Sequence, residues 1–154
     1  MKISDILRVK GGTLFTTSSQ ALLADAVSTM ADRDIGSLMV MDNGELTGIL
    51  SFREVIRAVV EHGGALGDTR VGQYMERHPL IAAPDTEIDE VRRMMLGRHV
   101  RYLPVMAERT LMGVISFYDV AKAVVDAQDF ENRMLKAYIR DWPVDEARDE
   151  KTSP

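Results

Sequence analysis

The chain has 154 residues, of which 45% are hydrophobic and 28% charged. This composition is typical of a globular protein with one ordinary domain or two very small ones. The net charge of −5 disfavours a general nucleic-acid binder, because such a protein needs a basic surface. Much of the acidity lies in residues 140–154, which we expect to form a disordered tail.

The sequence contains no cysteine, which excludes disulfides, thiolate metal sites and cysteine nucleophiles. No apolar run approaches the roughly 18 residues of a membrane-spanning helix. Residues 1–5 carry an acid where a signal peptide needs its apolar stretch. We therefore expect a cytoplasmic protein with no membrane and no nucleic acid among its partners.

The first elements are a short strand over residues 14–16 and an amphipathic helix. Ser18 and Ser19 offer N-cap chemistry between them. The apolar residues of the helix recur at spacings of three and four, which predicts one buried stripe: Leu22, Leu23, Ala26, Val27 and Met30.

An antiparallel strand pair follows. A buried strand over residues 38–41 leads into Asn43-Gly44, a strong signal for a two-residue hairpin turn. The second strand ends at Ser51, where a second helix begins. Residues 62–68 read as a linker because they contain three glycines. The order of elements is therefore β-α-β-β-α.

The chain then repeats itself. The sequence GILSFREV at residues 48–55 matches GVISFYDV at residues 113–120. The offset of 65 holds without a gap from pair 15/80 to pair 61/126, and 13 of these 47 pairs are identical. A short preface at residues 3–7 also matches residues 71–75 at an offset of 68. A match that stays in register over so many residues indicates two copies of one supersecondary unit.

We predict the boundaries of these units from the repeat. Unit one spans residues 1–68 and includes an N-terminal helix. Unit two spans residues 69–139 and ends in a long helix that runs from Phe117 towards Ile139. In unit two the first strand is expected at residues 80–82, with Asp85-Thr86 as N-cap chemistry for the helix that follows.

The next strand of unit two covers residues 103–106. Pro104 lies within it and cannot donate to a ladder, which favours an edge position there.

Metal and nucleophilic chemistry find little support. His62, His78 and His99 have no metal-ligand spacing and no accompanying carboxylate cluster. The sequence has no nucleophile elbow, no phosphate-binding Gly-rich loop of the P-loop type and no dinucleotide fingerprint. We expect neither a bound metal nor catalytic activity.

The repeated Ser-Phe-x-acid motif is the most informative feature. Ser51 and Glu54, like Ser116 and Asp119, lie three residues apart at a strand-to-helix junction. One interpretation is a capping box, in which serine and acid satisfy free amides of the helix. Another is a ligand site, because a helix N-terminus attracts phosphate and a carboxylate there accepts ribose hydroxyls. The two interpretations are compatible.

A second candidate is a basic cluster in unit two. Arg98, His99 and Arg101 lie between the first helix and the next strand. They form either a solvated loop that suits the C-terminus of the helix or a phosphate clamp. Phe52 and Phe117, at the first positions of the second helices, belong either to the core or to a surface that stacks on a base. Unit one has fewer basic residues here, so we expect unit two to bind phosphate better.

Together these residues resemble a tandem pair of cystathionine-β-synthase (CBS) domains, from residue 3 to about residue 139. The carriers are the repeat itself, RYLPV at residues 101–105 and GVISFYDV at residues 113–120. The resemblance implies an α+β (α/β) fold of two β-α-β-β-α units packed with pseudo-two-fold symmetry around two clefts. It also implies homodimers, and adenosine ligands that include AMP, ADP, ATP, S-adenosylmethionine and NAD(H).

The resemblance also implies site residues. Asp119 would hold the ribose in unit two, whereas Glu54, one methylene longer, stands at that position in unit one. Arg101 would contact phosphate. The full set of candidate ligand-binding residues is Asp119, Ser116, Arg101, Tyr102, Ala82, Ala83, Phe117, Tyr118, Thr17, Ser18, Ser37, Ser51 and Glu54.

The resulting hypothesis is a non-catalytic, homodimeric regulatory module. It binds an adenine nucleotide such as AMP, ATP or NAD(H) between the two units and signals to an unidentified regulated protein. The alternative is a protein–protein interaction module of the same fold whose ligand sites are degenerate.

Overall fold

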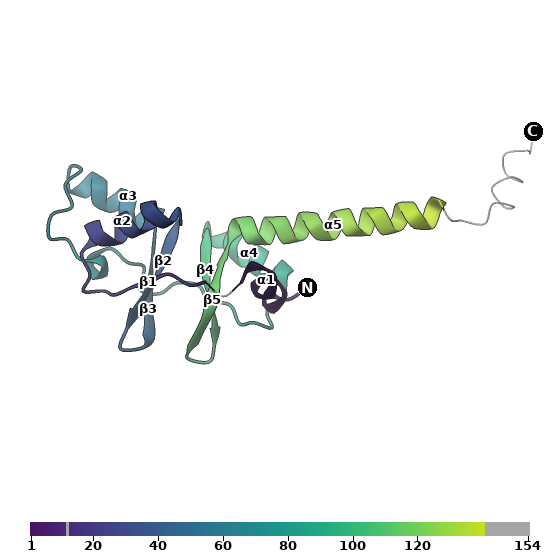
Figure 1. Cartoon of the computed structure of the whole chain (residues 1–154), viewed down its shortest axis with the longest axis horizontal. Coiled ribbons are helices and arrows are strands. Elements are labelled where there is room, and N and C mark those ends of the chain that lie inside the picture. The colour runs from purple at the N-terminus through teal and green to yellow at the C-terminus, as the bar shows by residue number, and fades with distance from the viewer. Residues whose placement is uncertain (12, 141–154) are drawn as a thin grey trace, which may run out of the picture. The chain divides into compact units, whose positions relative to one another are not determined.

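Figure 1 presents the computed structural model of the chain, which describes residues 1–11 and 13–140. The tail predicted at residues 140–154 therefore lies, from residue 141 on, outside the described residues. The fold is α+β, and its elements follow one another in this order: α1 (Ile3–Lys10), β1 (Thr16–Thr17), α2 (Leu23–Arg33), β2 (Ser37–Asp42), β3 (Glu45–Ser51), α3 (Phe52–Glu61), the 3-10 helix η1 (Val71–Gln73), α4 (Ile88–Arg98), β4 (Tyr102–Ala107), β5 (Thr110–Ser116) and α5 (Phe117–Arg140).

By its internal contacts the chain divides into two parts, one of residues 1–120 and one that begins at residue 121. These parts are not the two repeats, because all strands and the first turn of α5 belong to the first part. In the second, the described residues are the remainder of α5, which confirms the long last helix that the sequence predicts.

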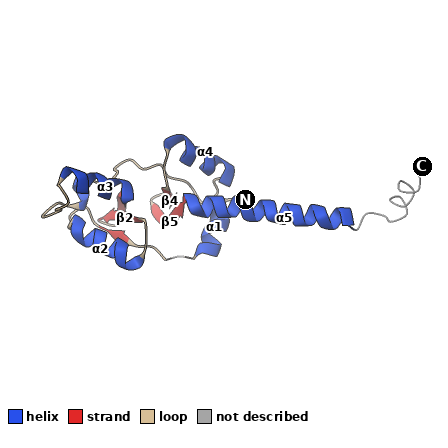
Figure 2. Cartoon of the chain, turned by 90° about the horizontal axis from the view of Figure 1, so that it is seen from above, coloured by secondary structure: helices blue, strands red, loops and turns tan. Residues whose placement is uncertain are grey.

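The first repeat builds a three-stranded sheet in the order β1-β2-β3, with helices α2 and α3 packed against it (Figure 2). Burial of its apolar side chains provides the main driving force for folding. The buried core of this repeat draws on both helices, on β2 and β3, and on the segment after the linker: Leu23, Ala26, Met30, Leu38, Val40, Leu50, Ala58, Val71, Tyr74 and Met75.

The two hairpins have the same register, as a true repeat requires. Ser37 pairs with Ser51 in the first, and Tyr102 pairs with Ser116 in the second. Both ladders shift at equivalent positions, after Val40 and after Val105. The predicted turn at Asn43-Gly44 is confirmed, since both residues have the positive φ that this hairpin turn needs.

The first strand of each repeat is shorter than predicted. In the first repeat, β1 covers only Thr16–Thr17 and pairs in parallel with β2. In the second, only an isolated parallel bridge joins Ala82 to Val105. The carbonyl of Pro104 accepts the Ala82 N–H at 3.0 Å, so the backbone of Pro104 faces residue 82. Because proline has no N–H to donate, the missing hydrogen bond falls at this short bridge and not in the ladder with β5.

The predicted N-caps of α2 and α4 are wrong. The cap residues are Leu22 and Glu87, and neither makes a side-chain cap hydrogen bond. Distant backbone satisfies the helix ends instead. The Leu23 N–H donates to the Thr69 carbonyl at 2.8 Å, and the Ile88 N–H donates to the Met1 carbonyl at 3.0 Å. Distant backbone carbonyls thus replace local side-chain caps as acceptors for the free N–H groups of these helices.

The two preface segments pack on opposite repeats. Helix α1 lies beside β5 of the second repeat (Figure 1), and its Ile3 N–H donates to the Thr86 carbonyl at 3.0 Å. The second preface packs on the first repeat, where Ile49 and Glu76 exchange two backbone hydrogen bonds of 2.9 Å. The boundary between units at residues 68 and 69 stays a prediction, and each folded repeat includes the other repeat's preface.

Candidate functional site

Both Ser-x-x-acid motifs lie where a strand ends and a helix begins, as predicted. Strand β3 ends at Ser51 and β5 ends at Ser116. The Ser116 N–H donates to Asp119 Oδ2 at 2.9 Å, and the Asp119 N–H donates to Ser116 Oγ at 3.0 Å. This reciprocal pair is a capping box. The local motif therefore holds an acid at each helix N-terminus.

Glu54 is a buried acid, with only 6% of its surface exposed. The Ser51 N–H donates to Glu54 Oε1 at 3.1 Å, and the Ser51 hydroxyl lies 3.1 and 3.2 Å from the two carboxylate oxygens. Burial raises the pKa of Glu54 above its ordinary value, although the hydrogen bonds from Ser51 oppose the rise. A buried carboxylate of this kind favours partners that donate hydrogen bonds.

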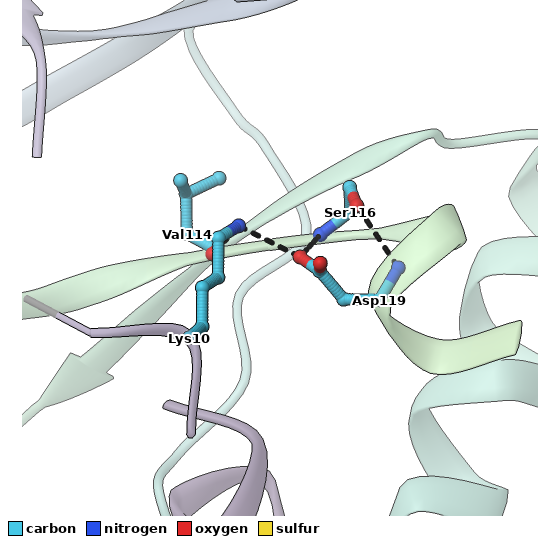
Figure 3. A network of polar contacts seen from close by, with 4 residues as sticks. All are labelled: Lys10, Val114, Ser116 and Asp119. Atoms are coloured by element: carbon cyan, nitrogen blue, oxygen red, sulfur yellow. Dashed lines mark hydrogen bonds and ion pairs between the residues drawn. The ribbon is translucent and has the colours of Figure 1, made fainter. Parts of the chain in front are cut away.

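Asp119 has a different environment, because a lysine from the N-terminal helix binds it (Figure 3). Lys10 Nζ lies 2.7 Å from Asp119 Oδ2 and also donates to the Val114 carbonyl at 2.9 Å. Burial by itself raises the pKa of Asp119. The hydrogen bonds and the charge of Lys10, together with the Ser116 N–H, outweigh that effect and hold the pKa below its ordinary value.

A cleft of about 1060 Å³ opens beside Glu54, and we call it the Glu54 cleft. It is large enough for a nucleotide. Three stretches of chain contribute most of its walls, namely the start of α3, the segment before and after residue 78, and the junction of α4 with β4. The residues that line it are Ile49, Ser51, Phe52, Arg53, Glu54, Ile56, Arg57, Tyr74, Met75, Glu76, His78, Pro79, Leu80, Met95, Leu96, Arg98, His99, Val100, Arg101, Tyr102 and Phe117.

Aromatic side chains form one part of this lining. Phe52 is 50% exposed and Phe117 is 37% exposed, so neither is a core residue. Tyr102 lies against Gly36, since a Cβ added at that glycine would collide with the tyrosine hydroxyl and lie 3.2 Å from the Phe52 ring. Gly36 therefore lets Tyr102 and Phe52 come together in the cleft.

The cleft is also basic, although the whole chain is acidic. Its lining includes four arginines and two histidines against the two carboxylates of Glu54 and Glu76. Arg53 donates to the backbone carbonyl of His99 and so joins the two repeats across the cleft. Arg98 and Arg101 are exposed. Guanidinium groups in such a concave surface are well suited to bind phosphate oxygens.

Five of the predicted ligand-binding residues line the Glu54 cleft: Ser51, Glu54, Arg101, Tyr102 and Phe117. Arg101 therefore lies with Glu54 of the other repeat, whereas the sequence pairs it with Asp119. The remaining eight residues are not in this lining: Asp119, Ser116, Tyr118, Ala82, Ala83, Thr17, Ser18 and Ser37.

Several of the eight residues outside the cleft lining have structural contacts of their own, whereas Tyr118 is 73% exposed. Ala82 and Ala83 make backbone hydrogen bonds, Ala82 with β4 and Ala83 with Thr86. Thr17 pairs with β2, and Ser37 is buried in the first hairpin. The assignment of these residues to a ligand site stays a prediction.

Sequence reasoning missed Lys10 and His78. These residues come from the two preface segments, and the offset of 68 makes them equivalent. Lys10 contacts Asp119, and His78 lines the cleft that contains Glu54. The preface repeat makes them equivalent in the sequence, but only the packing of each preface on the other repeat brings Lys10 to Asp119 and His78 to the lining of the Glu54 cleft.

Metal-binding clusters and membrane-spanning helices are both absent from the described residues 1–11 and 13–140. No group of three or more His, Asp or Glu side chains there is arranged to hold a metal ion. None of the helices in this part of the chain has the length and apolar character needed to cross a membrane.

Known proteins resemble this chain in sequence and in structure. The mitochondrial CBS domain-containing protein CBSX3 of Arabidopsis thaliana is 31% identical over 147 residues, which cover 90% of this chain and 71% of the relative. A putative signal-transduction protein with CBS domains from Burkholderia ambifaria has a similar structure, with a TM-score of 0.77, 30% identity, and coverage of 83% of this chain and 96% of the other.

A third similar structure is that of CBSX2 in complex with AMP. It matches with a TM-score of 0.69 and 22% identity, over 82% of this chain and 98% of CBSX2. The family model for the CBS domain matches twice, at residues 3–61 and 71–126. These matches coincide with the two repeats and their prefaces. The chain therefore belongs to the CBS domain family and contains a pair of CBS domains.

Proposed function

We propose that this CBS domain pair is a non-catalytic regulatory module that binds a phosphate-bearing adenosine ligand in the Glu54 cleft. One observation carries the proposal. A single concave surface combines a buried carboxylate at a helix N-terminus, aromatic side chains and four guanidinium groups. Those three chemistries correspond to the ribose, the base and the phosphate of a nucleotide.

Glu54 would accept hydrogen bonds from the ribose hydroxyls. Its carboxylate is buried, and Ser51 already orients it. Two vicinal hydroxyls supply two donors to one carboxylate, which compensates for the desolvation that raises its pKa.

The aromatic side chains would contact the base. Phe52, Tyr102 and Phe117 line the same cleft and keep part of their surface exposed. Stacking on an aromatic ring is favourable for any base, so the aromatic lining alone does not select adenine. The structure of CBSX2 in complex with AMP, a protein of the same fold, supports adenine.

The guanidinium groups would bind the phosphate, and they predict an order of affinity. Four arginines in the lining face two glutamates, so each added phosphate charge gains attraction. We expect ATP and ADP to bind more tightly than AMP, and AMP more tightly than adenosine. S-adenosylmethionine, which carries a sulfonium cation, should bind more weakly than AMP.

Isothermal titration calorimetry with adenosine, AMP, ADP, ATP, NADH, S-adenosylmethionine and GMP tests both parts of the proposal. A higher affinity for AMP than for GMP supports the base assignment. The advantage of ATP over adenosine should shrink as the salt concentration rises, because salt screens exposed charges. An order of affinity that ignores phosphate number would contradict the charge argument.

Arg101→Gln and Arg109→Gln form a matched pair of variants. Each variant removes one exposed arginine, Arg101 just before β4 or Arg109 in the turn between β4 and β5, but only Arg101 lines the cleft. The Arg101 variant should bind AMP at least several-fold more weakly and adenosine nearly as well as the original chain does. The Arg109 variant should bind both ligands normally. Equal effects of the two variants would remove Arg101 from the phosphate site.

The interaction module with degenerate sites remains the competing function. It predicts that no adenosine ligand binds and that the protein acts through a regulated partner alone. The absence of heat with every ligand, together with an unchanged melting temperature, would favour it over nucleotide binding.

We also propose that the module forms a homodimer. Helix α3 supports this, because Val59 and Val60 lie outside the lining of the Glu54 cleft and are 39% and 75% exposed, although both are large apolar residues.

A further inference from the structure

The two acids of the repeat differ in what binds them. Ser51 holds Glu54, which lines an open cleft. Ser116 holds Asp119 in the same way, but the Lys10 ammonium also binds the carboxylate at 2.7 Å (Figure 3). The side chain of Asp119 is 17% exposed and that of Lys10 is 34% exposed. The carboxylate is thus largely removed from solvent, whereas the ammonium keeps about a third of its side chain exposed.

Packing of the whole N-terminal helix brings Lys10 to this position. Ile3 and Ser4 donate backbone hydrogen bonds to residues 86 and 84, at 3.0 and 2.8 Å. Further along α1, Leu7 contacts Gly113, since a Cβ added at that glycine would lie 2.8 Å from a Leu7 methyl. Lys10, the last residue of the helix, then reaches both Asp119 and the Val114 carbonyl.

The same carboxylate oxygen has two donors before any ligand arrives. Asp119 Oδ2 accepts from the Ser116 N–H and from Lys10 Nζ. A ribose hydroxyl that approached this oxygen would compete with an ammonium group, which is the stronger partner because it is charged. At Glu54 the geometry is different, since Ser51 from its own motif binds the carboxylate.

We propose that Lys10 acts as an internal competitor for the ribose-binding carboxylate of Asp119. A ribose that binds both carboxylate oxygens of Asp119 must displace the ammonium from Oδ2, so the two related sites of the chain fill unequally and the Glu54 cleft fills first. Occupation of the Asp119 site then breaks the contact between α1 and the start of α5. This inference rests on the proposed nucleotide binding, which it extends to the second repeat.

Lys10→Met tests the competition by the stoichiometry of AMP binding in calorimetry. The original chain should bind one AMP per chain in the accessible concentration range. The variant should bind two, with affinity at the second site increased by about tenfold or more, as expected when a charge-assisted hydrogen bond no longer has to be broken. Arg8→Met, which changes a 76% exposed cation on the same helix, should keep a stoichiometry of one.

The double variant Lys10→Met/Asp119→Asn should return to one AMP per chain, because the added site needs the carboxylate. Two results would overturn the role of Lys10 without touching the Glu54 cleft. One is a stoichiometry of one in Lys10→Met with the first site intact. The other is weaker binding in Lys10→Met, which would make Lys10 a ligand contact. If neither protein binds AMP, the nucleotide proposal and its extension both fail.

A ligand-free measurement checks the ion pair independently. Carbon-13 NMR follows the titration of the Asp119 carboxyl, whose pKa should rise in Lys10→Met and stay unchanged in Arg8→Met. An unchanged titration of Asp119 in Lys10→Met would show that the ion pair does not form in solution, and this would also overturn the proposal.

Discussion

Gly48 and Gly113 occupy the same position in the two repeats, yet alanine should affect them differently. Each contacts the preface segment that packs on its repeat. A Cβ at Gly48 would lie 2.6 Å from the backbone carbonyl oxygen of Glu76 and 3.0 Å from Met75 Sδ. A Cβ at Gly113 would meet a single Leu7 methyl at 2.8 Å, with the next atom at 3.8 Å.

The magnitude follows from what can move. The Glu76 carbonyl cannot yield freely, because Glu76 and Ile49 exchange two backbone hydrogen bonds of 2.9 Å. Gly48→Ala should therefore cost about 1–3 kcal/mol of stability, the usual range for overpacking. The Leu7 methyl can rotate away, and alanine lowers the entropy of the unfolded chain by about 0.4–1 kcal/mol. Gly113→Ala should therefore be close to neutral.

Urea denaturation followed by circular dichroism measures both variants against the original chain. The free energy of unfolding should fall clearly for Gly48→Ala and change by less than about 1 kcal/mol for Gly113→Ala, with equal m-values. If Gly113→Ala proves as destabilising as Gly48→Ala, the reasoning from backbone and side-chain contacts is refuted. A neutral Gly48→Ala would instead contradict the tight packing of the second preface on the first repeat.

Three other predictions concern the two acids and the exposed face of α3. The pKa of Asp119 is lowered from 3.8, so its stabilisation is present above that pH and is lost as the pH falls through the folded value. Asp119→Asn should therefore melt earlier than the original chain at pH 7, and the difference should vanish in strong acid. The pKa of Glu54 is raised from 4.5, so ionisation of Glu54 costs stability as the pH rises through that range. Glu54→Gln should be more stable, relative to the original chain, at pH 7 than at pH 4. Val60→Asp should convert the proposed homodimer to a monomer in light scattering, and a dimer of unchanged strength would exclude that face of α3.

Local physics explains why much of the fold could be predicted from the sequence. The repeat, the hairpin at Asn43-Gly44 and the capping boxes all depend on residues close to one another in the chain. Periodicity and spacing report such contacts directly. The N-caps of α2 and α4 could not be predicted in this way, because carbonyls 46 and 87 residues distant from the capped amides satisfy them, at Thr69 for Leu23 and at Met1 for Ile88.

The candidate site likewise has some features that local spacing predicts and others that depend on packing between distant residues. Sequence alone identifies Ser51, Glu54, Ser116 and Asp119 as paired elements of one motif, since each pair is joined within three residues. It does not reveal that Arg101 belongs with Glu54, because that depends on how one repeat packs against the other. Tyr102 reaches its place only because Gly36, 66 residues earlier, leaves room.

The sequence by itself determined that this chain contains two copies of one unit with a Ser-x-x-acid motif at each strand-to-helix junction, because these features depend on local spacing. Its match to the CBS domain model then shows the family. Tertiary structure alone decided which partner each acid receives. The prefaces pack on opposite repeats, so a lysine 109 residues away binds Asp119, while Glu54 faces an open, arginine-lined cleft. Two nearly identical motifs thus have unequal chemistry, because burial and long-range packing, not spacing, set the environment of a carboxylate.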